Sequence, residues 1–366
     1  MNHTAFKRPG IILCIIAFIM SRTLNAQVLN DDNHPTEYIG ITGSCGPFKF
    51  EMNLMRDDTV LSGNLYKSVN SQPFYVYGNL AKNRKFKLSE TTVNQESSGT
   101  YEGVMAPDHS AKGTFADAAG NKETFEWHQN TAIPKVVFSD YYHQNCEQAK
   151  ANMDKNRDEM SYYDTICSYV SLSVPRIQLS NAAVSQRINQ AVDYIICNSS
   201  GNSYNTIIDL LQSVDNLSEG EGYSLEVSAG VITNEKNIYC IGISNIFYGY
   251  GAAHPNSSAE YYNYDIATGK LITLENLIQG SKRALLNRLG EKIFEQQNGA
   301  EGWFYESGKF SLPNDFAILK DGLMFAFDPY EIGPYAAGAP EVFISYKELK
   351  NYLFPHSAID SFLYGK

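Results

Sequence analysis

Short runs of alternating apolar and polar residues fill the first third of the chain after its N-terminal segment. Examples are 48–52, 60–66, 74–78 and 123–127, each rich in aromatic or β-branched residues and followed by turn residues. Short strands spaced about ten residues apart, without a helical period, are typical of an antiparallel meander. We therefore predict a β-meander domain over residues 38–130, closed as a small barrel or folded as a sandwich, with an accessory binding or spacer role.

The hydrophobic pattern changes between residues 131 and 167. Pro134 lies next to a short apolar run at 135–138, and a polar helix is predicted over about 145–160. We interpret 131–167 as a linker with a possible helix.

Residues 168–366 combine helical and strand periods in separate blocks. Asn181 precedes a helix whose Val184, Ile188 and Val192 share one face, and the runs 231–233 and 238–243 have the pattern of a β-hairpin. A capping box at 345–348 opens a last helix. This arrangement predicts an α+β domain in which helices pack on an antiparallel sheet, so that the whole chain belongs to the α+β class.

The stretch 246–277 is the most informative part of that domain. An aromatic strand with Tyr248 and Tyr250 leads into a Gly-rich corner at 251–256, and a second strand carries Tyr261 and Tyr262. Successive residues of a strand point to opposite faces, so some of these tyrosines must face solvent while others face the core. Tyrosine gives a large contact area at low entropic cost, which suits a binding surface.

Composition and charge limit the class of protein. The chain of 366 residues has 43% hydrophobic residues and a net charge of −11, without a basic stripe. Nucleic acid is therefore excluded as an expected partner. The acidic balance favours a cationic partner or serves only solubility.

The first residues have the pattern of a secretory signal. Lys7 and Arg8 precede an apolar run at 11–20, and Ala26 is the expected last residue before cleavage. We predict that residues 1–26 are a signal peptide and that the protein is periplasmic or extracellular; a retained anchor is the alternative. Cleavage would remove three basic residues and no acidic ones, which changes the net charge from −11 to −14.

Five cysteines remain after such cleavage, an odd number that leaves at least one unpaired. They are Cys45, Cys146, Cys167, Cys197 and Cys240. An oxidising compartment permits disulfides, but the spacing leaves the pairing open. There is no CxxC pair for metal or redox chemistry.

Three motifs in the second domain resemble the DUF3298 family. They are the Tyr-Gly-Tyr-Gly-Ala-Ala-His-Pro-Asn turn at 248–256, the Tyr-Asn-Tyr-Asp segment at 262–265 with Thr-Gly-Lys at 268–270, and the loop at 327–336. The region from about 169 to 216 is similar to the DUF4163 region that usually precedes it. The corner departs from the family's usual Gly-Gly-Ala-His, because Ala252 replaces a glycine.

This resemblance implies a non-catalytic part of the cell envelope machinery. Similar regions occur in the extracytoplasmic part of lysozyme-sensing anti-sigma factors and in the N-terminal part of peptidoglycan deacetylases. The implied function is a secreted binding protein that recognises a cationic extracellular protein such as lysozyme, or a glycan. The expected partner-binding residues are Tyr248, Tyr250, His254, Asn256, Tyr330 and Tyr335.

An envelope enzyme is the alternative. His254 could act as a general base on a cell-wall polymer if Glu260 or Asp265 set its pKa. Asp328 and Glu331 have the residue types of a glycosidase pair, although turn bonding and burial of Tyr330 explain them more simply. Because nucleophile, nucleotide-binding and metal-ligand motifs are not found, we assign no catalytic residue, metal or cofactor.

Overall fold

The computed structural model describes residues 36–70, 72–146, 167–199, 203–217, 222–299, 302–305 and 309–364. Its first domain is a closed barrel of eight antiparallel strands in sequence order. The strands are β1 (Glu37–Cys45), β2 (Phe48–Asp57), β3 (Val60–Lys67), β4 (Phe74–Leu80), β5 (Lys85–Thr92), β6 (Ser97–Met105), β7 (Ala111–Asp117) and β8 (Lys122–Gln129). β8 pairs with β1 and closes the barrel. The predicted meander is thus confirmed, in its barrel form.

Aromatic rings fill the interior of the barrel. The Trp127 ring stacks on Phe86 and Phe125, with centroids 4.8 and 5.0 Å apart. Gly103 lies opposite Gly113 in the register, and a Cβ at either position would meet backbone oxygen at 2.5 or 2.1 Å. The lumen is therefore a packed core, as expected for a barrel of eight strands.

The second domain contains a six-stranded sheet and a three-stranded sheet. The six strands are β9 (Lys135–Asn145), β10 (Ser168–Gln178), β11 (Tyr223–Glu235), β12 (Ile238–Gly249), β13 (Asn256–Asp265) and β14 (Lys270–Leu271). The three are β15 (Phe316–Ile318), β16 (Gly322–Ala326) and β17 (Glu341–Ser345). The α-helices in the described part of this domain are α3 (Ala182–Asn198), α4 (Ile207–Leu211), α5 (Leu274–Leu277), α6 (Arg283–Asn298), α7 (Tyr346–Leu349) and α8 (Asp360–Tyr364).

Several local predictions for this domain are confirmed. The Asn181 side chain accepts a hydrogen bond from the backbone N–H of Val184 and caps α3. Ser345 and Glu348 form the predicted capping box. β11 and β12 form the predicted hairpin, turning through Lys236 and Asn237, both at positive φ, as a two-residue hairpin turn requires.

The large sheet is mixed, whereas an antiparallel sheet was predicted. β10 and β11 run parallel, and the other neighbours are antiparallel. Parallel neighbours need a long crossover, and the segment containing α3 and α4 supplies it. β9 pairs with β10, so part of the predicted linker lies in the sheet. The predicted helix at 145–160 falls almost entirely outside the described residues.

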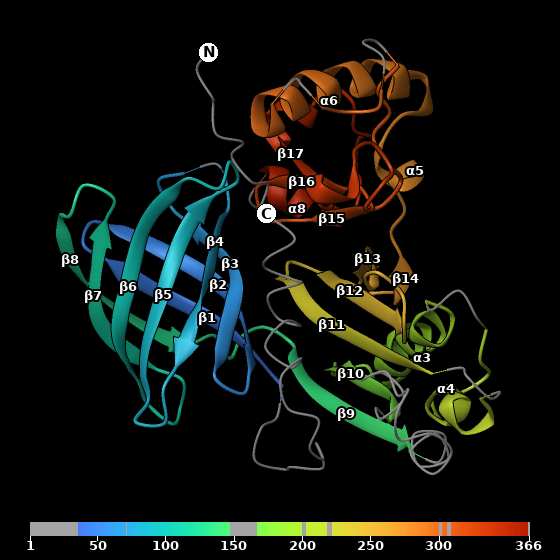
Figure 1. Cartoon of the computed structure of the whole chain (residues 1–366). Coiled ribbons are helices and arrows are strands. Elements are labelled where there is room, and N and C mark those ends of the chain that lie inside the picture. The colour runs from blue at the N-terminus through green and yellow to red at the C-terminus, as the bar shows by residue number, and fades with distance from the viewer. Residues whose placement is uncertain are drawn as a thin grey trace, which may run out of the picture.

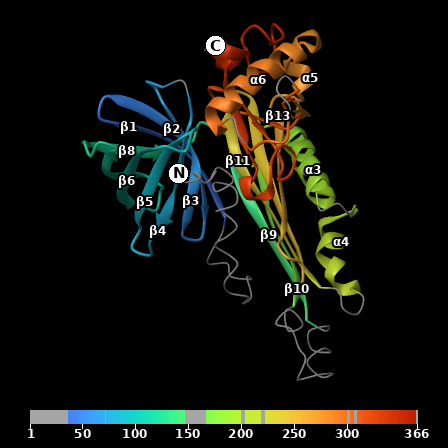
Figure 2. The same ribbon diagram turned by 45° about the horizontal axis from the view of Figure 1, so that its top comes forward.

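The barrel lies beside the face of the large sheet that α3 and α4 leave open (Figures 1 and 2). Asn53 of the barrel donates from Nδ2 to the carbonyl oxygen of Ile232 at 3.1 Å. Tyr75 donates from its hydroxyl to Sδ of Met324 at 3.0 Å, and Lys320 pairs with Glu51. The barrel therefore contacts both sheets of the second domain.

Candidate functional site

An exposed group of aromatic rings gathers where two loops of the second domain meet. The His254 ring, between β12 and β13, stacks on Tyr335 with centroids 4.3 Å apart and an interplanar angle of 25°. The Tyr335 hydroxyl donates to the carbonyl oxygen of Pro255 at 3.2 Å, and the Tyr330 ring lies 5.4 Å from that of Tyr335. We call His254, Tyr330 and Tyr335 the His254 surface, and the structure brings these three predicted residues together.

Tyr330 differs from the prediction that it is buried. Its side chain is 57% exposed, and its backbone is in the left-handed region at φ +72°. The turn that holds it is closed by the acids on either side: Glu331 donates its N–H to the Asp328 carbonyl at 3.0 Å, and the Asp328 N–H donates to Glu331 Oε2 at 2.9 Å. The turn thus lifts the ring out of the core, and left-handed backbone is uncommon for a bulky residue.

His254 lacks the surroundings expected of a general base. Its Nδ1 lies 3.0 Å from the carbonyl oxygen of Pro255, so this nitrogen carries the proton and donates it to backbone. Both predicted carboxylate partners are used elsewhere. Glu260 accepts from the Tyr262 hydroxyl, and Asp265 accepts from the backbone of Ala267 and the side chain of Thr268 at 2.8 Å each.

Two acidic groups of this region, Asp315 and Asp328, have raised carboxyl pKa values. Asp315 accepts the Tyr261 N–H at 2.7 Å, and burial raises the pKa of its carboxyl to about 8, helped by Glu260 and Asp328. Burial also raises the pKa of Asp328. Asp315 is therefore largely protonated at neutral pH, so the negative charge that would attract cationic groups beside these rings comes from the exposed acids Asp328 and Glu331.

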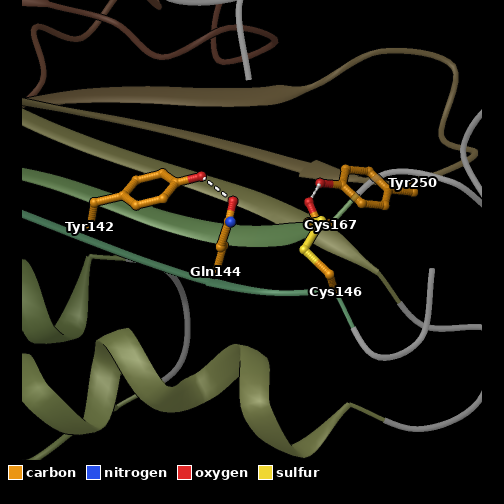
Figure 3. Close-up of a disulfide and its surroundings, with 5 residues drawn as sticks. All are labelled: Tyr142, Gln144, Cys146, Cys167 and Tyr250. Carbon is orange, nitrogen blue, oxygen red and sulfur yellow. Dashed lines mark hydrogen bonds between the residues drawn. A yellow bond between two sulfur atoms is a disulfide. The ribbon is translucent and has the colours of Figure 1, made fainter. Parts of the chain in front are cut away.

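Tyr248 and Tyr250 each hydrogen-bond to a backbone carbonyl outside the His254 surface. The Tyr248 hydroxyl donates to the Ala252 carbonyl at 3.1 Å, and the Tyr250 hydroxyl donates to the Cys167 carbonyl at 2.7 Å. The second bond is beside the disulfide between Cys146 and Cys167 (Figure 3). Asn256 is exposed at the start of β13 and pairs in the ladder with Phe247.

The structure shows one cysteine pairing that the sequence spacing left open. Cys146 at the end of β9 is joined to Cys167 just before β10, so it ties two neighbouring strands. The other described cysteines are free and buried: Cys45, Cys197 and Cys240.

A cavity of about 60 Å³, which no sequence pattern indicated, lies where the barrel meets the two sheets. Its wall includes Met55 and Tyr75 of the barrel, Tyr261 of β13, Met324 of β16 and Glu341 of β17. These residues come from five different strands, so no local motif could have indicated the cavity. A single charged residue in a strand, Glu341, was the one available signal.

A second cavity, of about 510 Å³, lies between the barrel and β9. Its wall includes Glu37 and His109, and the hydrogen bond with Glu37 raises the pKa of His109. His254 lines neither cavity.

In the described ranges, no group of three or more His, Cys, Asp or Glu side chains is arranged to hold a metal ion. No helix in the described part of the chain is long and apolar enough to cross a membrane.

Residues 268–347 match the DUF3298 family, described as a protein of unknown function. The chain is similar to a solved DUF3298 family member from Bacteroides fragilis, with a TM-score of 0.50 and 16% identity over 64% of this chain and 99% of that one. A DUF3298 family protein from Pseudomonas aeruginosa PAO1 matches with a TM-score of 0.47 and 17% identity, covering 61% of this chain and 95% of that one. These structural likenesses concern the fold.

Two curated relatives share part of the sequence. Immunogenic protein MPT64 of Mycobacterium tuberculosis and immunogenic protein MPB64 of Mycobacterium bovis are each 28% identical over 125 residues, 33% of this chain. The chain spans about half the length of these relatives, 50% of each. The DUF4163-like region stays a prediction.

Proposed function

We propose that the protein, whose residues 268–347 match the DUF3298 family, is a secreted, non-catalytic binding protein of the cell envelope that recognises a cationic partner protein such as a lysozyme-like hydrolase. The observation that carries this proposal is the His254 surface. Its rings are held by neighbouring backbone and by each other, as a recognition surface requires.

Charge supports a cationic partner. Asp328 and Glu331 are exposed beside Tyr330, and the whole chain has a net charge of −11. Lysine and arginine groups are attracted both to carboxylates and to tyrosine faces, by about 0.5–2 kcal/mol per ring. Such complementary charge also speeds association at low ionic strength.

Binding of lysozyme to the mature protein tests the proposal. We expect retention on immobilised lysozyme at low salt, and a loss of affinity of about tenfold when Tyr335→Ala removes the ring on which His254 stacks. Thermal unfolding verifies that the variant remains folded. Tyr364→Ala, which removes another exposed tyrosine, is the matched control and should bind normally.

Absence of binding at low salt would refute the lysozyme-like partner. Binding that Tyr335→Ala leaves unchanged would refute the His254 surface as its site. Turnover of a cell-wall polymer that a folded His254→Ala variant loses would replace the proposal with the enzyme alternative.

A glycan is the second candidate, favoured by one observation. The exposed Tyr330 ring has carboxylates on both sides, and this combination of an aromatic face with hydrogen-bond acceptors suits a sugar. Titration with soluble peptidoglycan fragments, with Tyr330→Ala as the variant, distinguishes this candidate from the protein partner.

A further inference from the structure

The cavity at the junction of the barrel and the two sheets has mainly apolar and aromatic walls, with the polar side chains of Ser62, Asn64 and Ser228 and one acidic group. Two methionines and two tyrosines, Met55, Met324, Tyr75 and Tyr261, line it together with Glu341. One water needs about 10–15 Å³ of such volume, so a cavity of about 60 Å³ has room for a few non-hydrogen atoms.

Glu341 is incompletely paired. Its Oε1 accepts a hydrogen bond of 2.8 Å from the Tyr261 hydroxyl, whereas its Oε2 is buried and has no hydrogen-bond partner in the described part of the chain. A buried carboxylate without a partner costs free energy that a cation or donor would recover. Because the terminal torsion of glutamate is broad, the carboxyl can turn one oxygen toward the cavity while Tyr261 keeps the other.

We propose that this junction cavity binds the ammonium head of a small organic amine, with Glu341 as its counter-ion and the rings of Tyr75 and Tyr261 around it. Aromatic rings attract organic cations through their faces, and the methionine thioethers adapt to an alkyl chain. The size of the cavity admits a primary ammonium with a short chain. That chemistry is shared by a free amine and by the side chain of a lysine in a partner protein.

Proton binding at Glu341 makes the site sensitive to pH. Burial raises the pKa of Glu341 to about 7, against the opposing effect of the Tyr261 hydrogen bond. The titratable groups that face it are Tyr261 of β13, Tyr75 of β4 and Asp315 before β15. Affinity for an ammonium should therefore rise as the pH increases through about 7, because only the carboxylate form attracts it.

Titration with propylammonium chloride, followed by calorimetry or ligand-observed NMR at pH 8, tests the proposal. We expect millimolar binding of propylammonium and at least about tenfold weaker binding of 1-propanol, which lacks the charge. Glu341→Gln should weaken propylammonium binding about tenfold or more. Glu102→Gln changes an exposed carboxylate of the barrel and serves as the control that should not alter binding.

A second variant reduces the room and leaves the charge in place. Gly230 lines the cavity, and a Cβ there would lie 3.9 Å from Cγ of Met55, so Gly230→Ala fits without moving backbone. It should also weaken propylammonium binding. His254→Ala should leave propylammonium binding intact, so this proposal and the proposed function fail independently.

A third titration, with lysine blocked at both backbone ends, distinguishes a free amine from the lysine side chain of a partner protein as the source of the ammonium. Binding equal to or tighter than that of propylammonium assigns the cavity to a partner's lysine, and weaker binding assigns it to a free amine. The proposal is overturned if propylammonium does not bind up to about 50 mM, if it binds no tighter than 1-propanol, or if Glu341→Gln binds it as well as the natural protein does.

Discussion

The barrel and the junction cavity each hold a glutamate with a buried carboxylate oxygen, but they surround it differently. In the barrel, the fully buried Glu90 accepts from Lys67 Nζ at 2.6 Å and from the Tyr101 hydroxyl at 3.0 Å. At the junction, Glu341 has the Tyr261 hydroxyl and, among the described residues, no basic partner. The same residue type is thus fully paired in one region and half paired in the other.

The barrel also surrounds Lys67, the cation that pairs with Glu90, with aromatic rings. Lys67 Nζ lies 4.5 to 5.1 Å from the ring centroids of Phe48, Phe74 and Phe115. The barrel therefore fills an aromatic cage with its own ammonium, whereas the junction has tyrosines, a carboxylate and space. The difference indicates that the first pair serves structure and that the second group is available to a ligand.

The largest expected effect comes from breaking the barrel pair. Lys67→Met leaves Glu90 buried without its cation, and we expect a loss of about 3–5 kcal/mol in the free energy of unfolding, measured by urea denaturation. The double variant Lys67→Met/Glu90→Gln should regain most of that loss, because it also removes the charge. A single variant as stable as the natural protein would show that the pair is not structural.

A smaller effect is expected from pH at the junction. The pKa of Glu341 is about 7 in the folded protein and 4.5 as its ordinary value, so the folded state binds the proton more tightly. The contribution of Glu341 to the free energy of unfolding is therefore fully present below pH 4.5. It is lost as the pH rises through about 7, by up to about 3 kcal/mol. The raised pKa of Asp315, about 8, acts in the same direction.

Unfolding free energies measured from pH 5 to pH 9 check this sign. Glu341→Gln cannot ionise at this position, so its stability should fall less over that range, and it should exceed the natural protein in stability at pH 9. A parallel fall in both proteins would contradict the assignment of this pH dependence to Glu341.

The smallest effect belongs to an exposed pair on the outside of the same barrel. Lys87 Nζ lies 2.8 Å from Glu102 Oε1, with side chains 67% and 60% exposed. We expect Lys87→Met to leave the urea midpoint unchanged within error, because water screens exposed pairs. A loss comparable to that of Lys67→Met would mean that burial does not separate the two pairs.

Much of the fold was predictable because its signals are local. Alternation along 38–130 indicated the meander, the spacing of Val184, Ile188 and Val192 indicated α3, and Ser345 with Glu348 indicated a helix start. Each signal depends on residues within one or two turns or strands. The parallel pairing of β10 with β11 was missed because strand direction depends on a crossover, which alternation does not reveal.

The candidate site was predicted in part. His254, Tyr330 and Tyr335, three of the six residues expected to bind a partner, lie together, and their role in binding stays a prediction. Tyr248 lies only six residues before His254, yet its side chain follows the strand pleat and bonds to Ala252. Alternation shows that neighbouring side chains diverge, but it does not show which face remains open.

The sequence by itself determined the class of fold, the hairpin of β11 and β12 and the helix caps, because these follow from local periodicity and turn chemistry. Only the tertiary structure decided that Cys146 bonds to Cys167, that Lys67 fills a cage of its own barrel, and that Glu341 meets Tyr75 across a domain junction. The physical reason is that these contacts join residues far apart in the chain, whose proximity depends on how complete sheets pack.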